Sequence, residues 1–560
     1  MMQKLSAIFL LLCFLIYVGC TLGASVAFAE TADGYVTNLY SPTAFEVGAV
    51  RVALDAHTAC REQRTLPLFV NTPGFGTTLP PSASAWQHRG FGGIAATPAP
   101  CSKLELAVGT HVRLEGDRGS TEYFRAAELT TYKAGSLRKV NGAALLQEAP
   151  HLVDGPQGWH GTLWVNGYAI AITPNTRLLS APAGTRLGYR MSFGSQTMVF
   201  HPKLPVGRSP IPFTSSLLAA NTWVSYHAVR AADGTVTASR VRFWTNQVDA
   251  GEKGYLERFH AEVFPPDYSK HLAGSIRFAQ TIEIIPDQAT QNSVSELGRD
   301  LVPQYQKDLP SADPTKIDFR FYVVRPFIAQ PKTMLVDTDG LLPTYKRGPL
   351  GLGLRVIHGF NSPTANTTVE DVVALPNGLI LIPDTALARL RDKAQLAALL
   401  SCAISSVLQK QAYMALPITV SRFTTLGRPL GNPDFAPAIQ VFAIWQNEQV
   451  LRLGIRSMQQ AGYDIREAPF AWSVARGEPL NNPVVASSAS ELKKGKQAVP
   501  WYASYAMNIL SRDYAAADYS KLKTGEAEYA KLRDELYKAA PDLRRLPASK
   551  KQSGSKAGAS

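Results

Sequence analysis

One stretch of the chain has residue types and spacing close to those of a catalytic site. Residues 400–406 read LSCAISS, inside a longer helical pattern. Side chains four residues apart share one face of a helix, so the thiol of Cys402 and the hydroxyl of Ser406 would lie on the same face. A thiolate binds zinc well, but a hydroxyl is a poor zinc ligand and one thiolate is not a site. The pattern therefore predicts a helix that presents a thiol and hydroxyls on one face, which by themselves do not form a metal site.

Cys402 could instead act as a nucleophile. A cysteine nucleophile needs a nearby base, usually a histidine held by a third group. All ten histidines lie between His57 and His358, and His358 belongs to a long Pro- and Gly-rich segment at 327–368 that would have to fold back. The other interpretation is that Cys402, Ser405 and Ser406 are small residues that fill a buried helix face. We favour this second interpretation.

The surrounding elements alternate between helix and strand. Apolar spacing predicts a helix from Gln291, and KIDFRFYVVRP and then DVVALPNGLILIP have the composition of strands. Two helical segments follow in TALARLRDKAQLAALLSCAISSVLQKQA. After a break rich in Pro and Gly at 416–433, a further helix spans APAIQVFAIWQNEQVLRLGIRSMQQAG. We expect a helical C-terminal region at 481–545 and a disordered basic tail at 546–560.

The order of these pieces, with ALPNG and LGIRSMQQAGYD as its most telling parts, resembles one family of zinc peptidases over about residues 287–480. This is the gluzincin family of the CAAX, HtpX and BepA proteases (peptidase family M-forty-eight). The family's active helix reads L-(A/S)-H-E-x-x-H, in which two histidines and a later glutamate bind zinc and the first glutamate is the general base. Aligned with it, Cys402 and Ser406 replace the histidines, Ala403 replaces the base, and Asn447 replaces the third ligand.

These replacements predict that zinc and hydrolysis by the family's mechanism are both lost, and we expect no cofactor. Glu448 lies one residue beyond Asn447, but a helix turns by about 100° per residue, so its side chain points elsewhere. The alternative is an active zinc metalloendopeptidase with a displaced or non-standard site.

The resemblance also implies a groove that can outlast the metal. In the family, the strand that corresponds to ALPNGLILI borders the substrate groove, where an extended peptide can pair with a strand edge. The candidate edge residues are Ala374, Leu375, Pro376, Asn377 and Gly378. In the other interpretation this strand is interior, because the residues on both of its faces are apolar. We expect a pseudopeptidase that binds polypeptide or an envelope protein partner; a structural spacer is a further possibility.

The first half of the chain contains a repeat. LAVGTHVRLEGDRGSTEYFRAAELTTY from Leu106 matches LAANTWVSYHAVRAADGTVTASRVRFW from Leu218 without gaps, and both alternate like strands. They are similar to the OB-like barrel repeats of exported bacterial proteins. The expected fold class is multidomain α+β, with two small antiparallel β-barrels or sandwiches before a mostly helical gluzincin-like domain with a small sheet. The expected boundaries are 34–150 and 158–247 for the repeats, 248–290 for a connector and 291–480 for the peptidase-like domain.

The N-terminus predicts export to the periplasm or the cell exterior. A short cationic start, an apolar stretch and Ala-Phe-Ala before Glu30 are typical of a signal peptide at 1–29. Lipidation at Cys20 and an uncleaved anchor are the alternatives, and only these would give membrane contact. In an oxidising compartment, Cys60 and Cys101 predict a disulfide. The net charge of +13 is diffuse outside the tail, so we expect no nucleic-acid partner.

Overall fold

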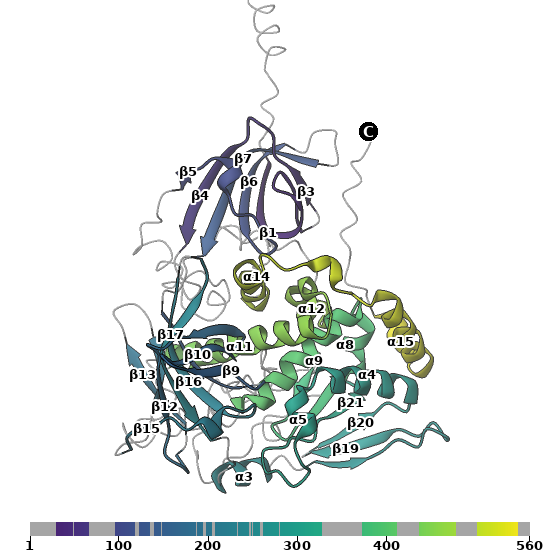
Figure 1. Ribbon diagram of the computed structural model, residues 1–560. Helices are drawn as coiled ribbons and strands as arrows, with labels where there is room; N and C mark the ends of the chain where they lie inside the picture. The colour runs from purple at the N-terminus through teal and green to yellow at the C-terminus, as the bar shows by residue number, and fades with distance from the viewer. Residues whose placement is uncertain are drawn as a thin grey trace, which may run out of the picture. The chain divides into compact units, whose positions relative to one another are not determined.

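The structure is a computed structural model of the chain that describes residues 30–65, 96–117, 123–134, 139–327, 372–411, 436–477 and 501–546, apart from single residues and short turns within these ranges. The predicted signal peptide, most of the Pro/Gly-rich insertion and the 328–371 segment lie outside the described residues, as does nearly all of the basic tail. The described chain separates into two compact units, one that ends at Lys133 and one that begins at Ala134. The predicted mixture of helices and sheets is confirmed (Figure 1).

The first unit contains a closed β-barrel of five strands. In the order β3-β2-β1-β6-β7 each strand pairs with the next, and parallel pairing of β3 with β7 closes the ring. Alternate residues such as Phe45, Val112 and Leu129 fill its interior. The strands of this sheet are β1 Glu30–Ser41, β2 Ala44–Val47, β3 Val50–Ala53, β4 Ala59–Thr65, β5 Thr97–Pro98, β6 His111–Asp117 and β7 Tyr123–Ala134.

The predicted disulfide between Cys60 and Cys101 is confirmed, with the two Cα atoms 5.2 Å apart. It ties β4 to the short 3₁₀ helix Cys101–Lys103. In the chain-entropy account, closing a loop with a separation of 41 residues destabilises the unfolded chain by roughly 3–4 kcal/mol.

The second unit begins with an eight-stranded sheet, which the structure does not show closing on itself. Its core contains Leu163, Ile170, Tyr226 and Phe243. β8 lies within the range predicted for the first repeat, yet it pairs with β16 of this sheet. The strands are β8 Lys139–Leu145, β9 His151–Gly155, β10 Gly158–Val165, β11 Tyr168–Ile172, β12 Arg177–Ser180, β15 Ile211–Pro212, β16 Trp223–Arg230 and β17 Val236–Trp244, with a separate hairpin of β13 Gly188–Phe193 and β14 Met198–Lys203.

Corresponding positions of the two repeats adopt the same local geometry. β6 and β16 begin 112 residues apart, and each pairs with the following strand through one irregularity at an equivalent place, next to Gly116 and Ala228. Thr58 donates to the carbonyl of Ala126 at 2.7 Å, and Thr176 donates to the carbonyl of Ala238 at 2.7 Å. Both sheets also contain parallel pairings, which the purely antiparallel prediction omitted. A parallel pair arises where the chain crosses from one edge of such a sheet to the other.

The predicted connector contributes strands to a second sheet in the same unit, in the order β18-β19-β20-β21-β23-β22. Helices α4 and α9 pack against each other and against this sheet (Figure 1). A helix predicted to run on from Gln291 is instead broken at Pro303, because proline cannot donate a helical hydrogen bond. The strands are β18 Glu262–Phe264, β19 Gly274–Phe278, β20 Gln280–Ile284, β21 Arg320–Val324, β22 Val373–Ala374 and β23 Leu379–Pro383. The helices are α3 Ala250–Glu257, α4 Gln288–Leu301, α5 Gln304–Asp308, α8 Asp384–Arg389, α9 Lys393–Leu408, α11 Ala436–Gln460, α12 Ala468–Ala475, α14 Trp501–Asp513 and α15 Glu526–Ala539.

Two glutamines join the helices to the eight-stranded sheet. Gln409, at the end of α9, accepts a hydrogen bond from the backbone N–H of Leu145 at 2.9 Å. Gln449 on α11 donates to the carbonyl of Ala143 at 3.0 Å. Both backbone groups lie on β8, so side-chain amides take the place of a further strand along this edge. Of the helices that the structure describes, none is long and apolar enough to cross a membrane.

Candidate functional site

Three of the four degenerate positions lie on the buried helix α9. Cys402 is buried in the contact between α9 and α11, where its Sγ lies 3.6 Å from the carbonyl oxygen of Val450. The opposing residue is Gly454, and a Cβ added there would lie 2.4 Å from this Sγ. The two helices therefore approach so closely at Cys402 that only glycine fits opposite it. Asn447 belongs to α11, but its side chain lies outside the described residues.

The residues at these positions do not fit zinc. Burial raises the pKa of the Cys402 thiol, which opposes formation of the thiolate that a metal requires. The Ser406 hydroxyl donates to the carbonyl of Ala403 at 2.8 Å, so its proton is already used within the helix. Ala403 has no ionisable group. The described residues include no cluster of three or more His, Cys, Asp or Glu side chains that could hold a metal ion.

Ser406 lines a pocket of about 180 Å³ at the end of α9, together with Pro376 and Asn377 of the candidate groove edge. The structure thus brings a degenerate ligand position and two groove-edge residues to one cavity. Most of the surface inside the pocket is apolar, and Val248, Leu256, Ile317 and Val407 contribute to it, although eight of the fourteen lining residues are polar or charged. The cavity is smaller than the roughly 300–1,000 Å³ of most ligand pockets, which suits a single inserted side chain better than a whole small molecule.

The candidate groove edge divides between a strand and a turn. Ala374 ends β22, and Leu375 to Gly378 form the turn into β23, in which the Gly378 N–H donates to the carbonyl of Leu375 at 3.0 Å. Gly378 has φ of +87°, which other residues rarely adopt. β23 pairs with β21 on one side and with β22 on the other, and all its residues are buried. In the described part of the sheet, the outer strand at this end is therefore β22.

An ion pair closes one end of the pocket. The Lys410 ammonium lies 2.8 Å from a carboxylate oxygen of Glu252 on α3, and both side chains are largely buried. Lys410 has φ of +50°, the left-handed conformation in which a helix commonly ends at glycine or asparagine. A lysine in that conformation indicates that the ion pair and the adjacent packing hold it there. Residues 158 apart in sequence make this contact, so no local pattern could have predicted it.

The opposite face of α11 carries a buried charge cluster that the sequence did not reveal. It comprises Glu448 and Arg452 of α11, Arg512 and Asp513 of α14, and Arg230 of β16. Asp513 lies 3.0 Å from Arg230 and 2.8 Å from Arg512. Burial alone would raise the pKa of Asp513, but Arg512, Arg452 and Arg230 together lower it to about 2. The Arg452 guanidinium also lies 4.1 Å from the centre of the Tyr168 ring.

This cluster settles where Glu448 points. Its carboxylate pairs with the Arg452 guanidinium one helical turn away on the same helix, whereas Cys402 packs against Gly454 on the side that faces α9. If the family alignment were shifted by one residue, Glu448 would take the place of Asn447 as the third zinc ligand. The structure does not support this, because Glu448 lies on a different face of α11 from the one that packs against Cys402, and the two residues do not share a site.

Two comparisons with known proteins, one against family models and one against curated proteins, found no match for this chain. No family model matches any part of it, and no curated protein matches it. The resemblance to zinc peptidases thus rests on residues 287–480 of this chain alone, and what it implies about activity is a matter of proposal.

Proposed function

We propose that the chain is an exported, non-catalytic relative of zinc peptidases that binds polypeptide at the pocket beside Ser406. The observation that carries the proposal is the contact between Cys402 and Gly454, which leaves no space for a metal ion on the side of the Cys402 sulfur that faces α11. The neighbouring pocket remains open, and two of the five candidate groove-edge residues, Pro376 and Asn377, line it.

The pocket's chemistry favours a peptide with an apolar anchor residue. A small cavity with mostly apolar walls stabilises one buried side chain of a partner, and such anchors dominate the affinity of many interfaces. The ion pair of Lys410 and Glu252 neutralises the charge at one end, so an apolar anchor meets no unpaired charge there. The partner's backbone would then run beside the turn that contains Asn377, next to the outer strand β22.

Export is part of the same proposal. The disulfide in the first unit persists only where thiols are not kept reduced, as in the periplasm or outside the cell. A closed β-barrel and a second, eight-stranded sheet ahead of the peptidase-like region are consistent with a scaffold for an envelope complex. Separation of the mature chain from the membrane and sequencing of its N-terminus would test cleavage after Ala29 against lipidation at Cys20.

The binding proposal is tested with two variants of Ser406, one that fills the pocket and one that leaves it open. Ser406→Phe places an aromatic ring in the cavity, whereas Ser406→Ala leaves the cavity open and removes only the bond to the Ala403 carbonyl. Peptides selected from a random library on the wild-type protein should bind Ser406→Ala within about twofold of wild type and should bind Ser406→Phe at least tenfold more weakly. Equal binding by both variants would exclude this pocket as the site.

Metal analysis tests the non-catalytic half of the proposal separately. The purified mature protein, dialysed against zinc and then against buffer, should retain far less than one zinc per chain and should not cleave a denatured protein substrate. Stoichiometric zinc that disappears in Cys402→Ala, together with cleavage that disappears with it, would establish the alternative of a metalloendopeptidase with a non-standard site.

A further inference from the structure

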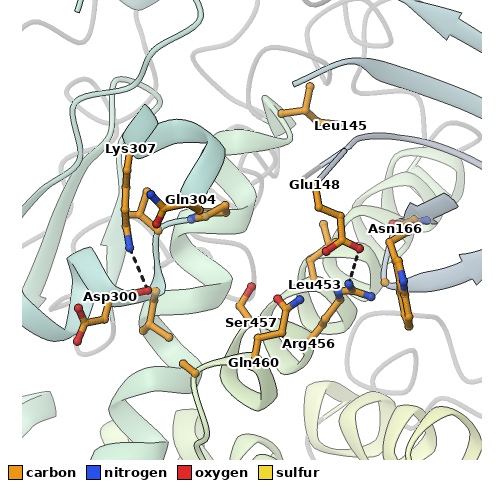
Figure 2. A pocket seen from close by; sticks show the side chains of 16 residues that line it. Leu145, Glu148, Asn166, Asp300, Gln304, Lys307, Leu453, Arg456, Ser457 and Gln460 are labelled. Carbon is orange, nitrogen blue, oxygen red and sulfur yellow. Dashed lines mark hydrogen bonds and ion pairs between the residues drawn. The ribbon is translucent and has the colours of Figure 1, made fainter. Parts of the chain in front are cut away.

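A second and larger pocket lies between the eight-stranded sheet and the helices of the same unit. Its volume is about 320 Å³, within the range of small-molecule sites, and it shares no lining residue with the pocket beside Ser406. Figure 2 shows its walls: Glu148 and Arg456 on one side, Asp300 and Lys307 on the other, and Ser457 and Gln460 between them. It plays no part in the function proposed above.

One wall of this pocket is formed by the turn between β10 and β11 and by helix α11. The turn between β10 and β11 has positive φ at Asn166 and Gly167, a conformation that suits asparagine and glycine. A Cβ at Gly167 would lie 2.4 Å from Cγ of Arg452, so the turn is seated directly on α11. On α11 itself Leu453, Ser457 and Gln460 recur at helical spacing, which turns them all toward the pocket.

Opposite charges balance on both walls. The Arg456 guanidinium lies 2.8 Å from the Glu148 carboxylate and 3.5 Å from the centre of the Trp164 ring. On the facing wall, Lys307 lies beside Asp300, and its ammonium donates to the Asp300 carbonyl at 3.5 Å. With two positive and two negative side chains in the lining, the pocket has no net charge that would select an anion or a cation.

The groups left to recognise a ligand are uncharged. The side chains of Ser457 and Gln460 form no hydrogen bonds within the part of the chain that the structure describes. A hydroxyl and a primary amide each both donate and accept, which complements the hydroxyl groups of a ligand. Trp164 adds an aromatic surface that is 36% exposed, and an aromatic ring beside polar groups suits a ligand with both apolar and polar faces.

The surrounding strands argue against an extended peptide in this pocket. β10, which carries Trp164, pairs with β9 on one edge and with β11 on the other. The edge of β8 near Leu145 is covered by Gln409 and Gln449. β9 pairs with β10 only as far as Thr162, so the edge of β10 that lies beyond β9 at Trp164 is about three residues long, too short for an extended peptide to pair with.

We propose that this pocket binds a neutral saccharide unit, held by Ser457 and Gln460 and packed beside Trp164. Sugar hydroxyls both donate and accept, and the ring carbons present apolar faces. The balanced charges of the walls disfavour uronic or sulfated sugars, whose charge would go uncompensated on burial.

Binding is measured by calorimetry and by ligand-observed NMR on the full mature chain, with maltotriose, cellotriose and chitotriose as probes. At least one probe should bind, and Gln460→Ala should weaken it by about fivefold, since a lost hydrogen bond of about 1 kcal/mol corresponds to roughly that factor. Gln459→Ala is the control, because Gln459 does not line the pocket. Ser457→Phe should abolish binding while leaving the thermal transition intact.

Failure of all three sugars at millimolar concentration would overturn the proposal. Equal binding by wild type and Ser457→Phe would overturn it as well. If instead the peptides selected on wild type lose affinity in Ser457→Phe but not in Ser406→Phe, the second pocket is a peptide site and the saccharide assignment is wrong. If peptide binding is lost in Ser406→Phe but not in Ser457→Phe, the peptide binds the first pocket, and the saccharide proposal is judged by the sugar measurements alone.

Discussion

The two faces of helix α11 bury side chains of opposite character. Toward α9, Gly454 meets the uncharged Cys402, and the helices approach to the distance that a missing Cβ allows. Toward α14 and the eight-stranded sheet, Arg452 lies in a cluster of buried charges around Asp513. The face that the family resemblance would make catalytic is small and neutral, whereas the charged face joins separate elements. Among the described residues of α11, the buried ionic groups thus join α11 to α14 and to the eight-stranded sheet.

The charged face gives the largest expected effect. Asp513→Ala leaves Arg230, Arg452 and Arg512 in a buried site without their shared carboxylate. Breaking a buried pair from one side costs about 3–5 kcal/mol, and denaturant titration should show a loss of that size. Glu535→Ala is the control, because its pair with Lys538 is exposed and should change the free energy of unfolding by less than about 0.5 kcal/mol.

Acid should act on the same group. The pKa of Asp513 in the folded protein is about 2, below its ordinary value of 3.8. The ionised carboxylate therefore stabilises the folded state fully above about pH 4, and this contribution is lost as the pH falls from 4 toward 2. Asp513→Asn should show a shallower decline over that window. An equally steep decline in wild type and variant would mean that other carboxylates dominate acid unfolding.

The neutral face gives the next effect. Gly454→Ala would improve helix propensity by about 1 kcal/mol at an exposed site, yet here its Cβ meets the sulfur of Cys402. Overpacking of this kind typically costs about 1–3 kcal/mol, so we expect a net loss of stability. The double variant Gly454→Ala with Cys402→Ala should recover part of it, as a double-mutant cycle would measure. A stabilising single variant would contradict the close approach of α9 and α11.

At the start of α9, the buried carboxyl group of Asp392 is expected to lower the stability of the folded protein when it is ionised. Burial, and then the nearby Glu467, raise the pKa of Asp392 to about 7. Since this folded-state pKa lies above the ordinary value of 3.8, its stabilising contribution is complete below about pH 4 and is lost as the pH rises through 7. Asp392→Asn keeps the cap on the Gln395 N–H and should be more stable than wild type at pH 8 but not at pH 4.5. The gain at pH 8 should be at most about 4 kcal/mol, since each pKa unit between 3.8 and 7 corresponds to about 1.4 kcal/mol. Melting curves at both values provide the check.

The smallest effect expected is at Cys402 itself. Its thiol is buried and its pKa is raised by burial, so little reactive thiolate is available. A thiol reagent should modify the native protein only as fast as the structure opens, and should modify the denatured protein at once. Rapid labelling of the native chain would show that the contact with Gly454 is not closed.

The sequence predicted those features that local pattern controls. The strand alternation that located the repeat also located equivalent hairpins, because period-two patterns report which face of a strand is buried. The disulfide could be predicted because both cysteines fall in one repeat of a chain whose N-terminus predicts export. The extent of the first repeat was less predictable: β8 follows the first hairpin directly but pairs with β16 some eighty residues later, and strand partners are not encoded locally.

The sequence predicted that Cys402 and Ser406 lie on one helix, but it did not predict which residues pack against that helix. Helical spacing placed Cys402 and Ser406 on a buried helix, but the partner across from Cys402 is a glycine on another helix. Arg452 and Glu448 have the spacing of an ordinary exposed pair on a helix, yet both are buried. Their burial depends on Tyr168 and Asp513, which come from distant parts of the chain.

The glutamines that cover β8 set a limit on how the molecule can be divided. A fragment cut after the second repeat, near residue 247, would lose Gln409 and Gln449 and would leave the Leu145 N–H and the Ala143 carbonyl without their partners. A bare strand edge of that kind recruits strands from other molecules, so such a fragment should aggregate on expression. Dissection between Lys133 and Ala134 follows the boundary of the compact units instead, and keeps β8 with the helices that protect it.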